Sequence, residues 1–136
     1  MSDTIFSKII RGEIPAQKLY EDDAVIAIMD IAPLAEGHCL VIPKEPAETL
    51  ADLSDEASAA VGRVLPRVVR AVRQVTGVEA CNVLQNNGEI AGQAVMHVHF
   101  HVIPKPVGGG LNKEWNPVEV DQKRSAELGR AMARLL

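Results

Sequence analysis

Hydrophobic residues recur along this chain with two periods, which separate its predicted helices from its predicted strands. The clearest helical stripe follows Ser54, a residue type that favours the N-cap, and ends at Gly77. Its apolar members are Val61, Val64, Leu65, Val68, Val69, Val72 and Val75. Pro66 falls inside the stripe and is predicted to kink or split the helix. Shorter helices are predicted over residues 5–12 and 121–136, the second with Leu128, Met132 and Leu135 on one side.

Short apolar runs bounded by turn-forming residues predict five strands. They cover residues 18–21, 24–30, 38–44, 79–85 and 96–104. The short links and the apolar–polar alternation favour a mostly antiparallel sheet with helices against one face, and hence an α+β fold with one long helix and short terminal helices. Residues 1–110 are expected to form the domain, and residues 111–136 an extension with a short helix that belongs to the same single domain.

Composition and charge narrow the class of protein. A chain of 136 residues, 47% hydrophobic and 24% charged, is typical of one globular domain. The net charge of −4 provides no basic surface for a nucleic-acid polymer, although a single nucleotide needs only a pocket. The amino terminus has no secretory pattern, and no apolar run approaches the roughly 18–20 residues of a membrane span. A soluble, cytoplasmic protein that binds no membrane is therefore expected.

Three of the four histidines lie on alternate residues of one apolar run, Met96 to Pro104. In a strand, His97, His99 and His101 would line one face, and Val98, Phe100 and Val102 the other. Neutral imidazoles can bind metal, hold phosphate, move protons or attack an electrophile. This run is therefore the predicted functional site.

The residues themselves leave three interpretations of the histidine run open. The H-x-H spacing suits a metal site, with Glu89 and the remote His38 as the nearest further ligands. Solvated histidines on an exposed strand face are the second interpretation. The third is nucleophilic catalysis on phosphorus, in which one ring nitrogen donates a hydrogen bond and the other attacks. Backbone N–H groups of the Asn86–Ala94 loop would then hold the phosphate oxygens.

The run from His97 to Ile103 resembles the signature of the histidine-triad nucleotide-binding family, in which three histidines alternate with apolar residues. Further landmarks extend this resemblance over about residues 4–106, closest to the branch of nucleoside phosphoramidate hydrolases. They are Ile5–Ile10, Glu13–Ala16, Met29–Pro33, Gly37-His38, Leu40–Lys44 and Gly92-Gln93.

The resemblance implies a role for each matching position. His99 would be the nucleophile, His97 and His101 would flank the phosphate, and the His97 carbonyl would orient the His99 ring. His38 would be the fourth histidine of the site. Asp30 would accept hydrogen bonds from the ribose hydroxyls, although an ordinary turn residue also fits its position. Phe6, Ile9, Ile28 and Ile31 would form the apolar slot for the base, and Asn86, Gly92 and Gln93 would contact the phosphate or the leaving group.

The family also implies a reaction. It is hydrolysis or transfer of a purine nucleoside 5′-phosphate derivative at the α-phosphorus through a nucleotidyl-histidine, with no metal or organic cofactor, in a homodimer. A dinucleoside polyphosphate hydrolase, a slow nucleotide-binding regulator and a metal-binding module remain alternatives. Two positions depart from the pattern of relatives. Ala94 stands where they usually have Ser or Thr, so the preferred leaving group is not determined by the resemblance. Thr4 and Ser7 replace a CxxC pair, so no zinc is expected there.

Overall fold

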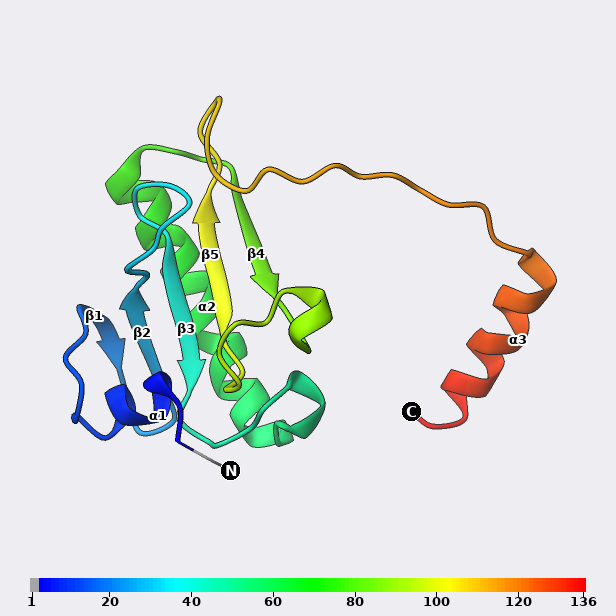
Figure 1. Ribbon diagram of the computed structural model, residues 1–136, viewed down its shortest axis with the longest axis horizontal. Coiled ribbons are helices and arrows are strands. Elements are labelled where there is room, and N and C mark those ends of the chain that lie inside the picture. The colour runs from blue at the N-terminus through cyan, green and yellow to red at the C-terminus, as the bar shows by residue number, and fades with distance from the viewer. Residues whose placement is uncertain (1–2) are drawn as a thin grey trace.

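The structure, a computed structural model, describes residues 3–136. Over these residues, five strands form one sheet in the order β1-β2-β3-β5-β4, with every neighbouring pair antiparallel (Figure 1). The strands are β1 (Lys18–Glu21), β2 (Val25–Met29), β3 (Cys39–Pro43), β4 (Cys81–Gln85) and β5 (Phe100–Pro104). The helices are α1 (Ile5–Ile10), α2 (Asp55–Thr76) and α3 (Gln122–Ala133), with short 3₁₀ turns at Leu50–Asp52 and Glu89–Ala91. The predicted α+β class and five-stranded antiparallel sheet are confirmed.

The strand that carries the histidines is shorter than predicted. β5 begins at Phe100, so only His101 of the three lies within it. The pairing of β5 stops at Phe100, which lies opposite Val41 of β3 and Gln85 of β4. The chain just before β5 is held differently, by a hydrogen bond of 2.8 Å from the Val98 N–H to the Ala47 carbonyl. The alternation of faces nevertheless continues back through His99 and His97, which pack near α1 as described below.

Strands β2 and β3 are apolar at nearly every position because helices cover both faces of the sheet. Side chains on one face pack against α2, and those on the other pack against α1, so the prediction that helices lie against one face only is wrong. Figure 1 shows α2 behind the sheet and α1 in front of it. The cluster against α2 includes Val25, Ala27, Cys39, Val41 and Val102; the cluster against α1 includes Ile26, Ile28, Leu40 and Ile42.

Helix α2 has the predicted ends. The Ser54 hydroxyl accepts a hydrogen bond from the Ala57 N–H, and Gly77 closes the helix with a left-handed backbone, φ 72°. The helix is not split at Pro66. Both Pro66 and Gly62, whose carbonyl loses its partner, are exposed, so water can replace the missing bond. Val75 is the member of the predicted apolar stripe that is not covered, since its side chain is 85% exposed.

The chain after β5 leaves the sheet. Figure 1 shows it running past β4 as an extended arm and ending in α3, away from the rest of the chain. Residues 112–136 are exposed throughout, including Leu128, Met132 and Leu135 of the predicted apolar side. Asp121 caps α3 by accepting a hydrogen bond from the Lys123 N–H. That residues 111–136 belong to the same domain therefore stays a prediction.

None of the helices within residues 3–136 combines the length and the apolar character that crossing a membrane requires.

Gly37, which precedes the site residue His38, has a left-handed backbone with φ 92° and no room for a side chain. An added Cβ would lie 2.6 Å from the Thr76 methyl carbon and 3.4 Å from Pro104 Cγ. Thr76 cannot turn away freely because its hydroxyl donates to the Val72 carbonyl and accepts from the Val78 N–H. This close approach explains why glycine stands at the start of β3.

Replacing Gly37 by alanine is expected to lower the free energy of unfolding by at least about 2–3 kcal/mol, from backbone strain and overpacking together. Gly12→Ala is the matched control, because Gly12 has φ 79° but open space where a Cβ would go. It should cost only about 1 kcal/mol, from the backbone alone. Urea unfolding of both variants measures the difference; equal losses would show that the contact with Thr76 does not matter.

Candidate active site

Three polar side chains meet where neighbouring strands bring them to the same face. Asp30 follows β2 and His38 precedes β3, and their backbones are joined by a hydrogen bond of 3.1 Å from the Asp30 N–H to the His38 carbonyl. His101 lies in the adjacent strand β5, where it pairs with Leu40 of β3. Since alternate residues share a face, these three continue the rows of Ile26 and Ile28, of Leu40 and Ile42, and of Ile103. The site therefore lies on the α1 face of the sheet.

Hydrogen bonds fix the tautomers of His38 and His101. The Leu34 N–H donates to His38 Nδ1 at 3.0 Å, so the proton of a neutral His38 ring is on Nε2. His38 Nε2 lies 2.9 Å from His101 Nδ1 and 3.3 Å from Asp30 Oδ2. His101 Nδ1 therefore accepts, and the His101 proton is on Nε2. At 3.9 Å from Asp30 Oδ2, His101 Nδ1 is too far for a direct hydrogen bond.

The rings of His97 and His99 are oriented by backbone carbonyls. His99 Nδ1–H donates to the His97 carbonyl at 2.7 Å, which leaves His99 Nε2 unprotonated. His97 Nε2–H donates to the Pro43 carbonyl at 2.8 Å. The other nitrogen of His97, Nδ1, is buried without a hydrogen-bond partner among residues 3–136. The expected contact between the His97 carbonyl and the His99 ring is thus present in the structure.

Burial keeps three of these histidines uncharged at neutral pH. It is the main cause that lowers the pKa of His99, against the opposing effect of the bond to the His97 carbonyl. Burial also lowers the pKa of His38, and the nearby Asp30 carboxylate partly offsets this. The pKa of His101 falls to about 4, first through burial and then through repulsion from His99 and His38. A neutral His99 with a free Nε2 is a competent nucleophile.

Asp30 takes part in both a turn and the site. Its Oδ1 accepts a hydrogen bond of 2.8 Å from the Ala32 N–H, as a turn residue would. Its Oδ2 faces His38, as given above. An ordinary turn residue therefore accounts for the contact of Oδ1, but not for that of Oδ2 with His38.

The four residues expected to form an apolar slot are not in one environment. Phe6, Ile9 and Ile28 are buried in the cluster between α1 and the sheet, whereas Ile31 is 92% exposed. The Phe6 ring is the one nearest the histidines, with its centroid 4.9 Å from that of His99 and 6.4 Å from that of His97.

The loop before the histidines is braced internally. Gln93 is buried; its carbonyl oxygen accepts from the Gly88 N–H, and its amide donates to the carbonyls of Glu48 and Val95. The N–H groups of Ala91, Gly92 and Gln93 bond to carbonyls within the loop, so they would have to exchange these partners to hold phosphate oxygens, and that role stays a prediction. Ala94 is exposed.

Asn86 is the loop residue that the sheet brings toward the histidines. Gln85, the last residue of β4, pairs with Phe100, the first of β5, so Asn86 follows β4 at the end of the sheet where His99 precedes β5. Its Nδ2 donates to the Gly92 carbonyl at 3.4 Å, a long bond that a ligand can displace. Asn86 is therefore available to a group bound at His99.

Metal ligation would require rearrangement. Asp30, His38 and His101 each offer a ligand atom, all within 4.8 Å of one another, a different set from the predicted H-x-H group. Two of these atoms already share the His38–His101 hydrogen bond. The Thr4 and Ser7 side chains form a capping box at the start of α1, each accepting a bond from the other's backbone N–H.

Two backbone groups that orient the rings, the Pro43 carbonyl and the Leu34 N–H, were not predicted from the sequence. Every residue except proline carries both groups, so no residue type marks their positions. The turn that brings Leu34 back to His38 does have a signal, the Pro33–Gly37 loop.

We expect His38→Leu to release the tautomer of His101, because leucine cannot donate to His101 Nδ1. In ¹⁵N–¹H spectra, His101 should change from a single Nε2–H tautomer to a mixture. His38→Gln is the matched variant, since its amide retains a donor and should preserve more of the Nε2–H form. An unchanged His101 spectrum in His38→Leu would show that another group sets this tautomer.

Comparisons with known proteins find related sequences and structures. A family model described as the HIT domain matches residues 11–107. The chain is 45% identical over 130 residues to adenosine 5′-monophosphoramidase hnt1 of Schizosaccharomyces pombe, covering 95% of each chain. A hypothetical protein from Leishmania major has a solved structure that is 46% identical, with a TM-score of 0.93 over 98% of this chain and 95% of that one. A HIT family member from Bacillus subtilis is 36% identical, with a TM-score of 0.92 over 99% and 98% of the two chains.

Proposed function

The chain belongs to the HIT domain family, and on that premise we propose that it hydrolyses or transfers purine nucleoside 5′-phosphate derivatives of the phosphoramidate type. The observation that carries the proposal is the bond from His99 Nδ1–H to the His97 carbonyl, which directs a free Nε2 away from the backbone. The name of the S. pombe relative, an adenosine 5′-monophosphoramidase, supports the substrate class.

In the first step, His99 Nε2 attacks the α-phosphorus. The Nε2–P bond forms as the bond from phosphorus to the amine breaks, and the leaving nitrogen takes a proton from solvent, which balances the proton that water releases in the second step. His101 is placed to donate a hydrogen bond from Nε2 because the bond from His38 occupies its Nδ1. The product is a nucleotidyl-His99 and a free amine.

In the second step, water attacks the same phosphorus. A P–O bond forms, the Nε2–P bond breaks, and the water proton passes to solvent. The nucleoside monophosphate leaves, and His99 returns to its neutral form. The scheme uses no metal or organic cofactor; hydrogen-bond donors at the site, among them the Nε2–H of His101, would stabilise the phosphate charge.

The remaining residues have supporting roles in the proposal. Asp30 binds the ribose through the oxygen that faces His38, and Asn86 and Gly92 contact the phosphate or leaving group. Phe6, Ile9, Ile28 and Ile31 contact the base. Gln93 is a positioning residue, since its amide is fully used in bracing the loop. A homodimeric state and a cytoplasmic location are part of the same proposal.

The test compares two substrates on one preparation. An adenosine phosphoramidate and a dinucleoside polyphosphate are supplied separately in excess, and release of nucleoside monophosphate is followed. Faster turnover of the phosphoramidate is expected. Faster turnover of the polyphosphate would favour the dinucleoside polyphosphate hydrolase, and binding without turnover of either would favour the regulator.

A further inference from the structure

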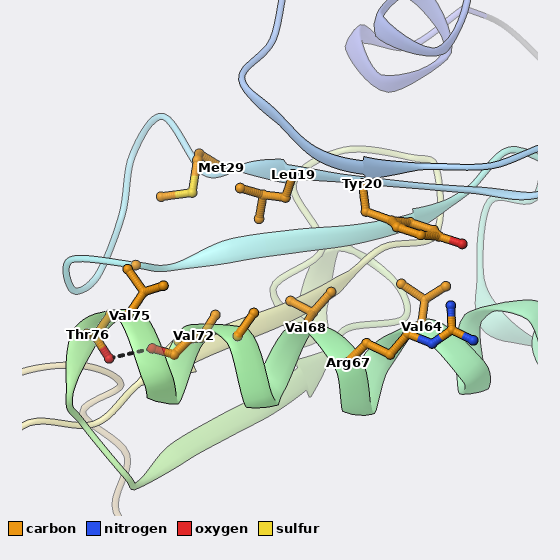
Figure 2. A pocket seen from close by; sticks show the side chains of 11 residues that line it. Leu19, Tyr20, Met29, Val64, Arg67, Val68, Val72, Val75 and Thr76 are labelled. Atoms are coloured by element: carbon orange, nitrogen blue, oxygen red, sulfur yellow. Dashed lines mark hydrogen bonds between the residues drawn. The ribbon is translucent and has the colours of Figure 1, made fainter.

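An apolar groove lies on the α2 face of the sheet, away from the histidines. Figure 2 shows it between β1 and α2, with Leu19, Tyr20 and Met29 on the strand side and valines of α2 opposite. Its volume is about 380 Å³, and Arg67 is its one charged lining residue within residues 3–136. Val75 lies at one end with its side chain 85% exposed, and Leu19 on the strand side is 47% exposed.

A helix of this chain has an apolar side without a partner. Leu128, Met132 and Leu135 are spaced at four and three residues, which places them on one side of α3 and its C-terminal end. Their exposed fractions are 44%, 58% and 86%. α3 spans 12 residues, close to the length of the stretch of α2 from Val64 to Thr76 that lines the groove.

The path of the arm recurs in solved relatives. Residues 111–136 make up about a fifth of the chain. The TM-scores of 0.93 and 0.92 for the L. major and B. subtilis structures cover 98% and 99% of the chain. Scores this high require the arm and α3 to lie in nearly the same place in those proteins, although their sequences are only 46% and 36% identical. An exposed arm that keeps one path in separate proteins is held by something outside its own chain.

We propose that α3 packs in the groove between β1 and α2 of a second copy of this chain. The groove of the same chain is a poor match, because it borders β1, whereas the arm leaves past β4 at the opposite edge of the sheet (Figure 1). A second copy placed beyond β4 would present its own groove to the arm. If each copy places its α3 in the groove of the other, a second helix packs beside each α2, and the apolar residues of α3 and of the groove are covered in both copies.

Thiol cross-linking between differently tagged, co-expressed chains tests the proposal. One chain carries Met132→Cys on the apolar side of α3, and the other carries Val75→Cys or Leu19→Cys at the groove. Both carry Cys81→Ser, since Cys81 is half-buried, while Cys39 is fully buried and stays. The matched control replaces Met132→Cys by Ala133→Cys, which points away from the apolar side.

A short bifunctional thiol reagent is expected to join the two tags in both Met132 pairings, with at least fivefold less product from Ala133→Cys. Equal yields from the two helix positions, or no mixed product from either groove position, would overturn the proposal. A chain carrying both Met132→Cys and Val75→Cys provides the second test. A cross-link within single chains at high dilution would show that the arm folds back on its own groove, and would also overturn it. Neither result depends on catalysis, so the proposed reaction stands or falls separately.

Discussion

Replacing His99 by alanine is expected to lower the rate of nucleotidyl transfer by at least about a thousandfold, because the attacking nitrogen is removed and water must react directly. The measurement is a single turnover with an adenosine phosphoramidate labelled in the nucleotide. In the unmodified protein, samples stopped in alkaline denaturant, in which the nitrogen–phosphorus bond to imidazole survives, should contain label bound to the protein before free monophosphate accumulates. In His99→Ala, the bound label should be absent.

A rescue experiment distinguishes the loss of a nucleophile from the loss of structure. His99→Gly leaves space next to the Phe6 ring, whose centroid is 4.9 Å from that of His99. Added imidazole should restore consumption of the phosphoramidate and yield free nucleotidyl-imidazole as product. Protein-bound label that persists in His99→Ala would place the covalent bond on another residue and contradict the mechanism.

Much of the fold could be predicted because local patterns and tertiary contacts agree. Ser54 and Gly77 bound α2 as their capping chemistry predicts, and the apolar runs of β2 and β3 form strands as predicted, although helices cover both faces of these strands rather than the one face expected. The errors arise where a local rule competes with solvent or with a neighbour. Of the predicted kink or split at Pro66, the split is absent because the lost bond faces water. β5 starts at Phe100, where its pairing with β3 and β4 ends, and the Val98 N–H bonds to the Ala47 carbonyl instead.

The site was predictable as a set of residue types but not as a set of bonds. Alternation alone indicates that the three histidines share a face, and the resemblance adds His38 and Asp30. The nitrogen that each ring leaves free depends on backbone groups of Leu34, Pro43 and His97. Such contacts depend on strand register and turn geometry, which side-chain identity does not encode. Gln93 shows the same limit, since a buried amide that braces a loop has the same sequence signal as one that binds a ligand.

Mild acid is expected to destabilise the fold strongly, because His38, His99 and His101 all have lowered pKa values. An unfolded histidine binds a proton near pH 6.5, whereas the folded His101, with a pKa of about 4, does not. The unfolded state therefore binds more protons between these values, and the free energy of unfolding falls as the pH falls. From pH 7 to pH 5, His101 alone should account for a loss of about 2 kcal/mol, with His38 and His99 adding to it.

Urea unfolding at half-unit pH steps measures this loss of stability. Most carboxylates titrate below pH 5, so the loss between pH 7 and pH 5 comes mainly from the histidines. Glu21, Asp22 and Glu45 have pKa values below their ordinary range, so their contributions are lost mainly at lower pH. His101→Gln should flatten the dependence by at least about 1 kcal/mol over the same interval, since glutamine binds no proton. A flat profile for the unmodified protein would mean that these imidazoles are not held uncharged. The neutral nucleophile on which the proposed first step relies would then lose its physical basis.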